Sequence, residues 1–255
     1  MYYAVNNINL YVKEEGHGKP ALLFLHFWGG SADTWNGVTG ILKHDFKCIS
    51  YDHRGWGRSD KPAGGYSIPE LAQDTLALVK ALDLQNYILI GHSMGGKVAQ
   101  YIAAQKPDGL QKLVLVAPSP SLPTIPPAEI LEGMRSAYTS LENINATIDH
   151  VFKAGDIGPD IREQLIKDIQ SHNESSRLGW TDTALQEDVS AGVAQIAVPT
   201  LIIAGENDLV DPPQRLEAEV KALIPRSEMT IINGAGHLIM LQKPGQVAAL
   251  IKDFI

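Results

Sequence analysis

Short runs of bulky apolar residues alternate with segments of helical periodicity over the first 117 residues. The apolar runs predict buried strands at 21–25, 46–51, 87–90 and 113–116, after two short strands within 2–15. A capping box, Ser67-Ile68-Pro69-Glu70, predicts the start of one helix, and an Ala-rich helix follows Ser93. Alternation of this kind predicts an α/β fold with a mostly parallel sheet and helices on both faces.

The pattern changes after residue 117. Residues 118–197 contain no buried-strand run, but apolar stripes predict helices at 130–141, 144–152 and 161–169, and the box Thr183–Gln186 predicts the start of a fourth. Alternation then resumes with a strand at 200–204, a helix at 217–223, a strand at 229–232 and a helix at 244–255. An interruption of roughly 80 residues is far longer than an ordinary connection. We therefore expect a core domain of residues 1–117 and 198–255, with 118–197 inserted as a helical cap, or lid.

A strand leads directly into the pattern Gly91-His92-Ser93-Met94-Gly95, and a helix follows it. The two glycines have no Cβ, which permits a sharp and strained turn that lifts the Ser93 hydroxyl out of the sheet. G-x-S-x-G between a strand and a helix is typical of a nucleophilic serine. The alternative is an ordinary glycine-rich turn whose serine only caps the helix.

A nucleophilic serine needs a histidine base that is oriented by an acid. In a parallel sheet these groups lie beyond the carboxyl ends of strands. His237 follows the strand at 229–232, whereas the other histidines lie elsewhere in the pattern. Glu206, Asp208 and Asp211 all follow the strand at 200–204. We favour Asp208 as the acid and expect Glu206 and Asp211 to be surface or capping groups.

The oxyanion formed by attack on a carbonyl needs two N–H donors. The residue after the nucleophile, Met94, supplies one candidate. The loop after the strand at 21–25 supplies the other, with Trp28 as the favoured donor, unless this loop is only a glycine-rich turn with packed aromatic residues.

Four aromatic residues are candidates to bind substrate in an apolar pocket: Phe27, Tyr138, Phe152 and Trp180. Tyr138 and Phe152 lie on apolar helical stripes, for which core packing is the stronger expectation. Trp180 lies outside a clear helix and is the preferred contact from the lid.

Composition narrows the classes of partner. The 255 residues are 44% hydrophobic and 20% charged, as in ordinary globular proteins, and the net charge of −8 argues against nucleic acid or an anionic membrane as a partner. The single cysteine, Cys48, excludes an internal disulfide. We see no metal-ligand cluster, cofactor motif, secretory signal or apolar run of the ~20 residues that span a bilayer, and we expect a cytoplasmic, cofactor-free protein. The oligomeric state cannot be read from the sequence.

With these residues assembled, the chain resembles the α/β-hydrolase fold superfamily over essentially its full length. Within it, the chain is similar to small cofactor-free carboxylesterases, the group of arylesterases and non-haem chloroperoxidases. The segments that carry the resemblance are Gly91–Gly96, Asp52–Ser59, Gly205–Asp208 and Gly236-His237. Through the first, third and fourth of these segments, the resemblance implies the roles of nucleophile, acid and base for Ser93, Asp208 and His237. In that family the acid heads a D-x-V-x-P pattern, which Asp208–Pro212 fits. It also implies that Asp52–Ser59 is a structural turn.

One position departs from the family pattern, in which a glycine usually follows the histidine where this chain has His26-Phe27. Phenylalanine disfavours positive φ, so this loop either follows another course or does not need positive φ at that position.

The function expected from these residues is hydrolysis of a carboxylic ester or lactone through an acyl-enzyme on Ser93. A carbon–carbon bond hydrolase or lyase with the same triad, or a ligand receptor of the same fold with slow turnover, are the alternatives. Haloalkane dehalogenases and epoxide hydrolases are disfavoured because those relatives need an aspartate at the position of Ser93.

Overall fold

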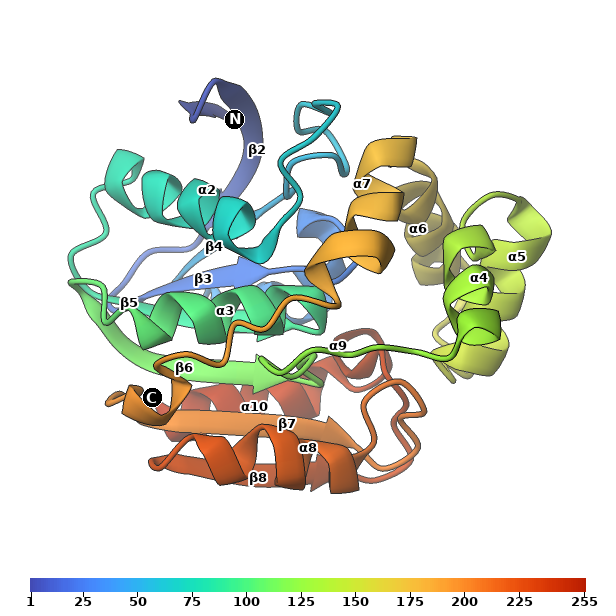
Figure 1. Ribbon diagram of the computed structural model, residues 1–255. Coiled ribbons are helices and arrows are strands. Elements are labelled where there is room, and N and C mark those ends of the chain that lie inside the picture. Colours follow the sequence, from blue (N-terminus) through green and yellow to red (C-terminus); the bar gives the residue numbers. More distant parts are fainter.

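A single eight-stranded sheet forms the centre of the computed structural model, which describes residues 1–255 (Figure 1). The strand order is β1-β2-β4-β3-β5-β6-β7-β8. The first two strands pair antiparallel and β2 is antiparallel to β4, whereas all the other pairs are parallel. The prediction of a mostly parallel sheet is therefore confirmed. The strands are β1 (Tyr2–Val5), β2 (Ile8–Glu15), β3 (Ala21–Leu25), β4 (Lys47–Tyr51), β5 (Tyr87–His92), β6 (Leu110–Val116), β7 (Thr200–Gly205) and β8 (Ser227–Ile232).

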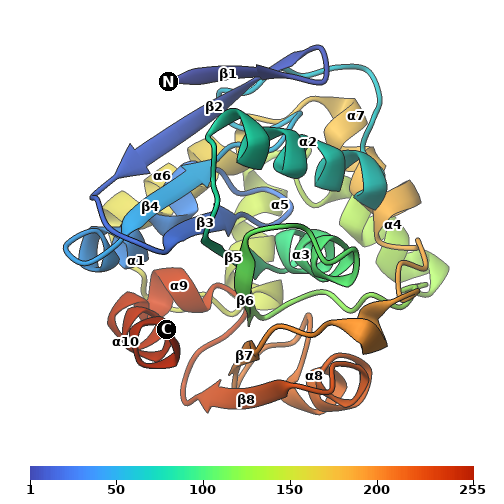
Figure 2. The same cartoon turned by 90° about the vertical axis from the view of Figure 1, so that its left-hand side faces the viewer.

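Helices cover both faces of the sheet (Figure 2). One face carries α2 (Ile68–Ala81), α3 (Met94–Ala104) and α8 (Pro213–Glu219), and the other carries α1 (Asn36–Leu42), α9 (Ile239–Gln242) and α10 (Pro244–Phe254). The capping box predicted before α2 is formed, since the Ser67 hydroxyl accepts from the Glu70 N–H and the Glu70 carboxylate accepts from the Ser67 N–H. No helix has both the length and the apolar character needed to cross a membrane.

The sheet separates two hydrophobic cores. The larger lies under α2, α3 and α8, and the smaller lies under α1, α9 and α10. Helix α1 was not predicted from the sequence, although Trp35, Val38 and Leu42 are fully buried in the smaller core. The helix has only seven residues and contains two glycines, so its periodic signal is weak.

Residues 118–197 form only helices and loops between β6 and β7, and we call them the helical segment. Its helices lie beyond the end of the sheet toward which the parallel strands point, and the chain after them runs back along α3 to the start of β7 (Figure 1). The helices are α4 (Ala128–Ser136), α5 (Leu141–Ala146), α6 (Pro159–Gln170) and α7 (Glu174–Gly179), with π-helical turns at Thr147–Val151 and Trp180–Ala184. The prediction of a helix that begins at Thr183 is wrong, because a π-helical turn ends there and the Gln186 side chain donates to the Thr181 carbonyl.

Two stretches of the helical segment, 121–124 and 185–189, lie side by side. The Thr124 N–H donates to the Leu185 carbonyl, and the Val189 N–H donates to the Ser121 carbonyl, each at 3.0 Å. We call residues 121–124 and 185–189 the neck. The side chain of Lys97 on α3 is fully buried against the neck. The Nζ of Lys97 donates to a carbonyl of each stretch, at 3.3 Å to Leu122 and 2.9 Å to Leu185.

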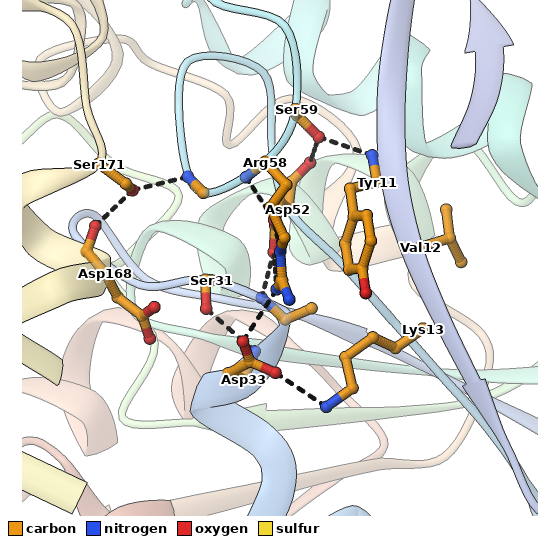
Figure 3. Close-up of polar contacts among 12 residues, drawn as sticks. Tyr11, Val12, Lys13, Ser31, Asp33, Asp52, Arg58, Ser59, Asp168 and Ser171 are labelled. Carbon is orange, nitrogen blue, oxygen red and sulfur yellow. Dashed lines mark hydrogen bonds and ion pairs between the residues drawn. The ribbon is translucent and has the colours of Figure 1, made fainter. Parts of the chain in front are cut away.

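A turn at Asp52–Ser59 connects the sheet with the helical segment (Figure 3). The buried Asp52 carboxylate accepts from the N–H groups of Ala32 and Arg58 and from the Arg58 guanidinium. The Gly57 N–H in the turn donates to the Ser171 hydroxyl at 2.7 Å, just after α6. The carboxylate of this turn is therefore occupied by structural hydrogen bonds.

Candidate active site

Ser93 occupies a strained turn between β5 and α3. Its φ is +52° and its ψ is −115°, which a non-glycine residue rarely adopts. The neighbouring glycines are required by crowding: a Cβ on Gly91 would lie 2.3 Å from the Gly95 carbonyl oxygen, and one on Gly95 would lie 2.6 Å from the Leu25 carbonyl oxygen. In this turn Ser93 lines a cavity, and its hydroxyl makes no hydrogen bond within the chain.

The cavity has a volume of about 490 Å³, within the range of small-molecule sites. It lies between the carboxyl ends of the strands and the helical segment. Ser93 and His237 come from the sheet side, Phe27 and Trp28 from the loop after β3, and Phe152 and Trp180 from the helical segment. Most of the lining is apolar, which favours an uncharged ligand.

His237 and Asp208 form a buried pair. The Nδ1 of His237 lies 2.8 Å from Oδ2 of Asp208, and neither side chain is more than 1% exposed. Burial favours a lower pKa for His237, but the charge and hydrogen bond of Asp208, together with the charge of Asp211, outweigh it and raise the pKa. Glu206 is exposed and accepts from the Gly234 N–H instead. Of the three candidate acids, Asp208 is therefore the one that is hydrogen-bonded to His237.

The backbone of His237 is held on two sides. Its N–H donates to the Phe152 carbonyl at 2.8 Å, and its carbonyl lies 2.9 Å from Nε2 of His92. Burial lowers the pKa of His92 well below its usual value, so its ring is neutral and Nε2–H is the donor. His92 was not singled out by the sequence analysis, and its position next to the nucleophile is the only signal that pointed to it.

Two backbone N–H groups beside Ser93 are available to an oxyanion. The Trp28 N–H has no acceptor within the chain. The first hydrogen bond of α3 runs from the Lys97 N–H to the Ser93 carbonyl, so the N–H of Met94 precedes the helical ladder. Met94 itself is buried, and its side chain does not line the cavity.

The loop that carries Trp28 is a tight turn closed by a hydrogen bond from the Gly30 N–H to the Phe27 carbonyl. Positive φ falls on Gly29, at +102°, and Phe27 has none. The departure at Phe27 is thereby explained, because the turn needs glycine only at its third position. The buried ring of His26, whose pKa burial lowers to about 4, lies with Nδ1 2.7 Å from the Phe27 carbonyl and fixes the turn from below.

Comparison with known proteins identifies the family. The sequence profile of the α/β hydrolase fold matches residues 20–151 and 161–244. The chain belongs to the α/β hydrolase fold family. It is 30% identical to the AB hydrolase superfamily protein YisY of Bacillus subtilis over 97% of this chain and 96% of that protein. It is 29% identical to a non-heme chloroperoxidase of Streptomyces lividans over 92% of each chain.

Solved structures of this fold superpose closely. A bromoperoxidase from Bacillus anthracis gives a TM-score of 0.88 at 23% identity, covering 97% of this chain and 95% of that chain. An enol-lactonase from Burkholderia xenovorans gives 0.87 at 22% identity, covering 100% and 99%. An esterase from Exiguobacterium antarcticum gives 0.87 at 23% identity, covering 98% and 97%. At these identities the likeness shows the fold.

Within this α/β hydrolase fold, three of the four aromatic residues expected to bind substrate line the cavity. They are Phe27, Phe152 and Trp180. Tyr138, named as a candidate substrate contact, does not line it. It packs behind Trp28, with which it stacks at a centroid distance of 4.1 Å, as the stronger expectation of core packing predicts, whereas Phe152 departs from that expectation. The Tyr138 ring is buried and its hydroxyl donates to the Trp28 carbonyl in the loop after β3.

The prediction that Asp211 is a surface or capping group is wrong. It is 2% exposed, lines the cavity and accepts from the guanidinium of Arg215 at 3.0 Å. Burial raises the pKa of Asp211 to about 7 despite the neighbouring Arg215. Asp211 and Arg215 stand four residues apart, the spacing of a helical ion pair, but only the course of the loop after β7 places them at the cavity.

Proposed function

We propose that this α/β hydrolase is a serine hydrolase that cleaves a carboxylic ester or a lactone through an acyl-enzyme on Ser93. One observation carries the proposal. One largely apolar cavity is lined both by a strained serine without a hydrogen-bond partner, Ser93, and by His237, whose Nδ1 lies 2.8 Å from the buried carboxylate of Asp208. This set of groups is what acyl transfer to a serine requires.

In the first half-reaction, Ser93 Oγ attacks the carbonyl carbon while His237 Nε2 takes the hydroxyl proton. Asp208 holds Nδ1–H and stabilises the imidazolium that forms. The N–H groups of Trp28 and Met94 donate to the carbonyl oxygen as it gains negative charge. His237 then protonates the leaving alkoxide, and the acyl group remains on Ser93.

In the second half-reaction, water attacks the acyl-enzyme while His237 takes one of its protons, and the carboxylic acid and free Ser93 are released. For a lactone, the alcohol and the acid are parts of one product. Residues of the helical segment enclose the reacting groups: Phe152 and Trp180 line the cavity opposite the sheet. We therefore propose that residues 118–197 act as the lid of the site.

Names of similar proteins support the same class of reaction, since two of the superposed structures are described as an enol-lactonase and an esterase.

The test is hydrolysis of p-nitrophenyl esters, from acetate to octanoate, by the wild type, Ser93→Ala and Ser121→Ala. Loss of the nucleophile should lower kcat by ~10⁶. Ser121 is a matched control, because it is also a buried serine without a hydrogen-bond partner but does not line the cavity. Equal rates for the wild type and Ser93→Ala would overturn the proposal. Carbon–carbon substrates and slow-turnover ligand binding would then be the alternatives to test.

A further inference from the structure

Three exposed aliphatic side chains surround the opening of the cavity that contains Ser93. Ile130 is 57% exposed, Val151 is 47% exposed and Leu209 is 61% exposed, yet all three line the cavity. They come from α4, from the π-helical turn after α5 and from the loop after β7. We call these three residues the rim.

The rim continues the apolar lining of the interior. Met134 and Val210, which are partly buried, line the cavity beside rim residues of the same elements. Single exposed hydrophobic residues are common on protein surfaces and need no explanation. Three that converge from separate parts of the chain on one cavity form a continuous apolar path from the inside of the molecule to solvent.

Charges near the rim disfavour an anionic ligand. Arg215 lines the cavity, but its guanidinium is already bonded to Asp211 at 3.0 Å and to Glu219 at 2.9 Å. Glu129, which also lines the cavity, adds a negative charge with no ion-pair partner. The chain as a whole carries −8. An uncharged chain therefore fits the rim better than a carboxylate tail or an anionic lipid surface.

We propose that the rim binds the distal part of an uncharged alkyl chain whose ester or lactone carbonyl lies at Ser93. The substrates are then alkyl esters or lactones with chains long enough to reach from Ser93 to the rim. This inference rests on the proposed function for its reaction, but the binding site itself does not depend on catalysis. Each methylene that the site removes from water favours binding by about fourfold.

The first test compares kcat/KM for p-nitrophenyl acetate and octanoate, both below their aggregation limits. We expect the wild type to prefer octanoate by at least roughly tenfold, because several methylenes contact the lining and the rim. The double variant Ile130→Ser, Leu209→Ser should lower the octanoate-to-acetate ratio by about tenfold. Ile41→Ser, at an exposed isoleucine of α1 outside the cavity, should leave the ratio unchanged. A wild-type preference for acetate, or an equal loss on both esters, would overturn the inference.

The second test separates this inference from the proposed function. Ser93→Ala, alone and combined with the two rim substitutions, is titrated calorimetrically with methyl octanoate and methyl acetate. Tighter binding of the octanoate that is lost in the rim variant supports the rim even when no ester is hydrolysed by the wild type. Equal affinity for the two esters overturns it even when Ser93-dependent hydrolysis is found.

Discussion

The hydroxyl of Tyr138 donates a hydrogen bond of 2.8 Å to the backbone carbonyl of Trp28, and the two rings stack at 4.1 Å. The indole Nε1–H of Trp28 in turn donates to the Arg177 carbonyl at 3.1 Å. Both partners of Trp28 belong to the helical segment. The position of the candidate oxyanion donor is therefore fixed by residues that lie more than a hundred positions later in the chain.

Substitution Tyr138→Phe should lower kcat for ester hydrolysis by about tenfold and leave KM nearly unchanged. The substitution removes a hydrogen bond that positions the Trp28 peptide but removes no donor, so the loss should stay below the ~10²–10³ that loss of a donor costs. Steady-state kinetics separate the two parameters. Tyr66→Phe is the matched control, because the Tyr66 hydroxyl also donates to a backbone carbonyl, that of Pro62, outside the cavity. Equal losses of kcat in both variants would contradict a positioning role for Tyr138.

The pH dependence of hydrolysis should report His237. The base acts in its neutral form, so kcat/KM should rise with pH through the pKa of His237, which Asp208 raises above 6.5. Asp208→Asn removes the charge that raises this pKa and favours the wrong tautomer. We expect kcat to fall by about 10⁴ and the acidic limb to move to lower pH.

Glu206→Gln is the control for this experiment, because it changes a carboxylate at the end of the same strand that is exposed and bonded only to a backbone N–H. Its pH–rate profile should coincide with that of the wild type. A profile for Asp208→Asn with an unchanged acidic limb would show that Asp208 does not set the pKa of the base.

The stability of the hydrogen bonds across the neck should depend on Lys97. Lys97→Met keeps the length of the side chain but removes both hydrogen bonds to the neck carbonyls. The amide N–H groups of Thr124 and Val189, which bridge the neck, should then exchange with deuterium about tenfold faster, while Leu89 in β5 keeps its protection. Lys106→Met, near the exposed end of the same helix, should leave all three rates unchanged. Uniformly faster exchange would indicate general destabilisation instead.

Asp168 should make stability depend on pH. Burial, with the charges of Asp33 and Asp52, raises its pKa to about 6 from 3.8, against the hydrogen bonds of Gln164 and Ser31. Because the folded-state pKa is the higher one, the folded state is favoured when the Asp168 carboxyl is protonated. This contribution to stability is fully present below pH 3.8 and is lost as the pH rises through about 6. The loss amounts to at most about 3 kcal/mol.

Asp168→Asn removes this ionisation, so the free energy of unfolding relative to the wild type should rise between pH 4 and pH 8. Urea unfolding at both values measures the difference. Asp160→Asn, at an exposed position of the same helix, should show no such gain. A constant difference between Asp168→Asn and the wild type across this pH range would refute the assignment.

The strands and the positions of Ser93, Asp208 and His237 relative to them could be predicted from the sequence. Buried parallel strands are continuous apolar runs, and the ends of such runs mark one edge of the sheet, where these three residues follow β5, β7 and β8. The glycines around Ser93 added a local signal, because crowding at the turn tolerates no Cβ.

The sequence did not predict what depends on packing between distant segments. Tyr138 sits on an apolar stripe whether it faces substrate or the back of Trp28, and only the docking of the helical segment decides between them. Asp211 reads as a loop carboxylate, but the turn at Asp208 directs it inward toward Arg215. The short helices α1 and α7 were missed because seven and six residues give too few turns for a periodic pattern.

The closeness of the two stretches of the neck bears on how this protein can change. Residues 124–185 begin and end at one place, because the Thr124 N–H donates to the Leu185 carbonyl and the Val189 N–H donates to the Ser121 carbonyl beside it. A segment of different length or helix number could be joined to the same two stretches without moving β6 or β7. The candidate catalytic groups on the sheet would stay in place, while the cavity walls that come from the helical segment were exchanged as one unit.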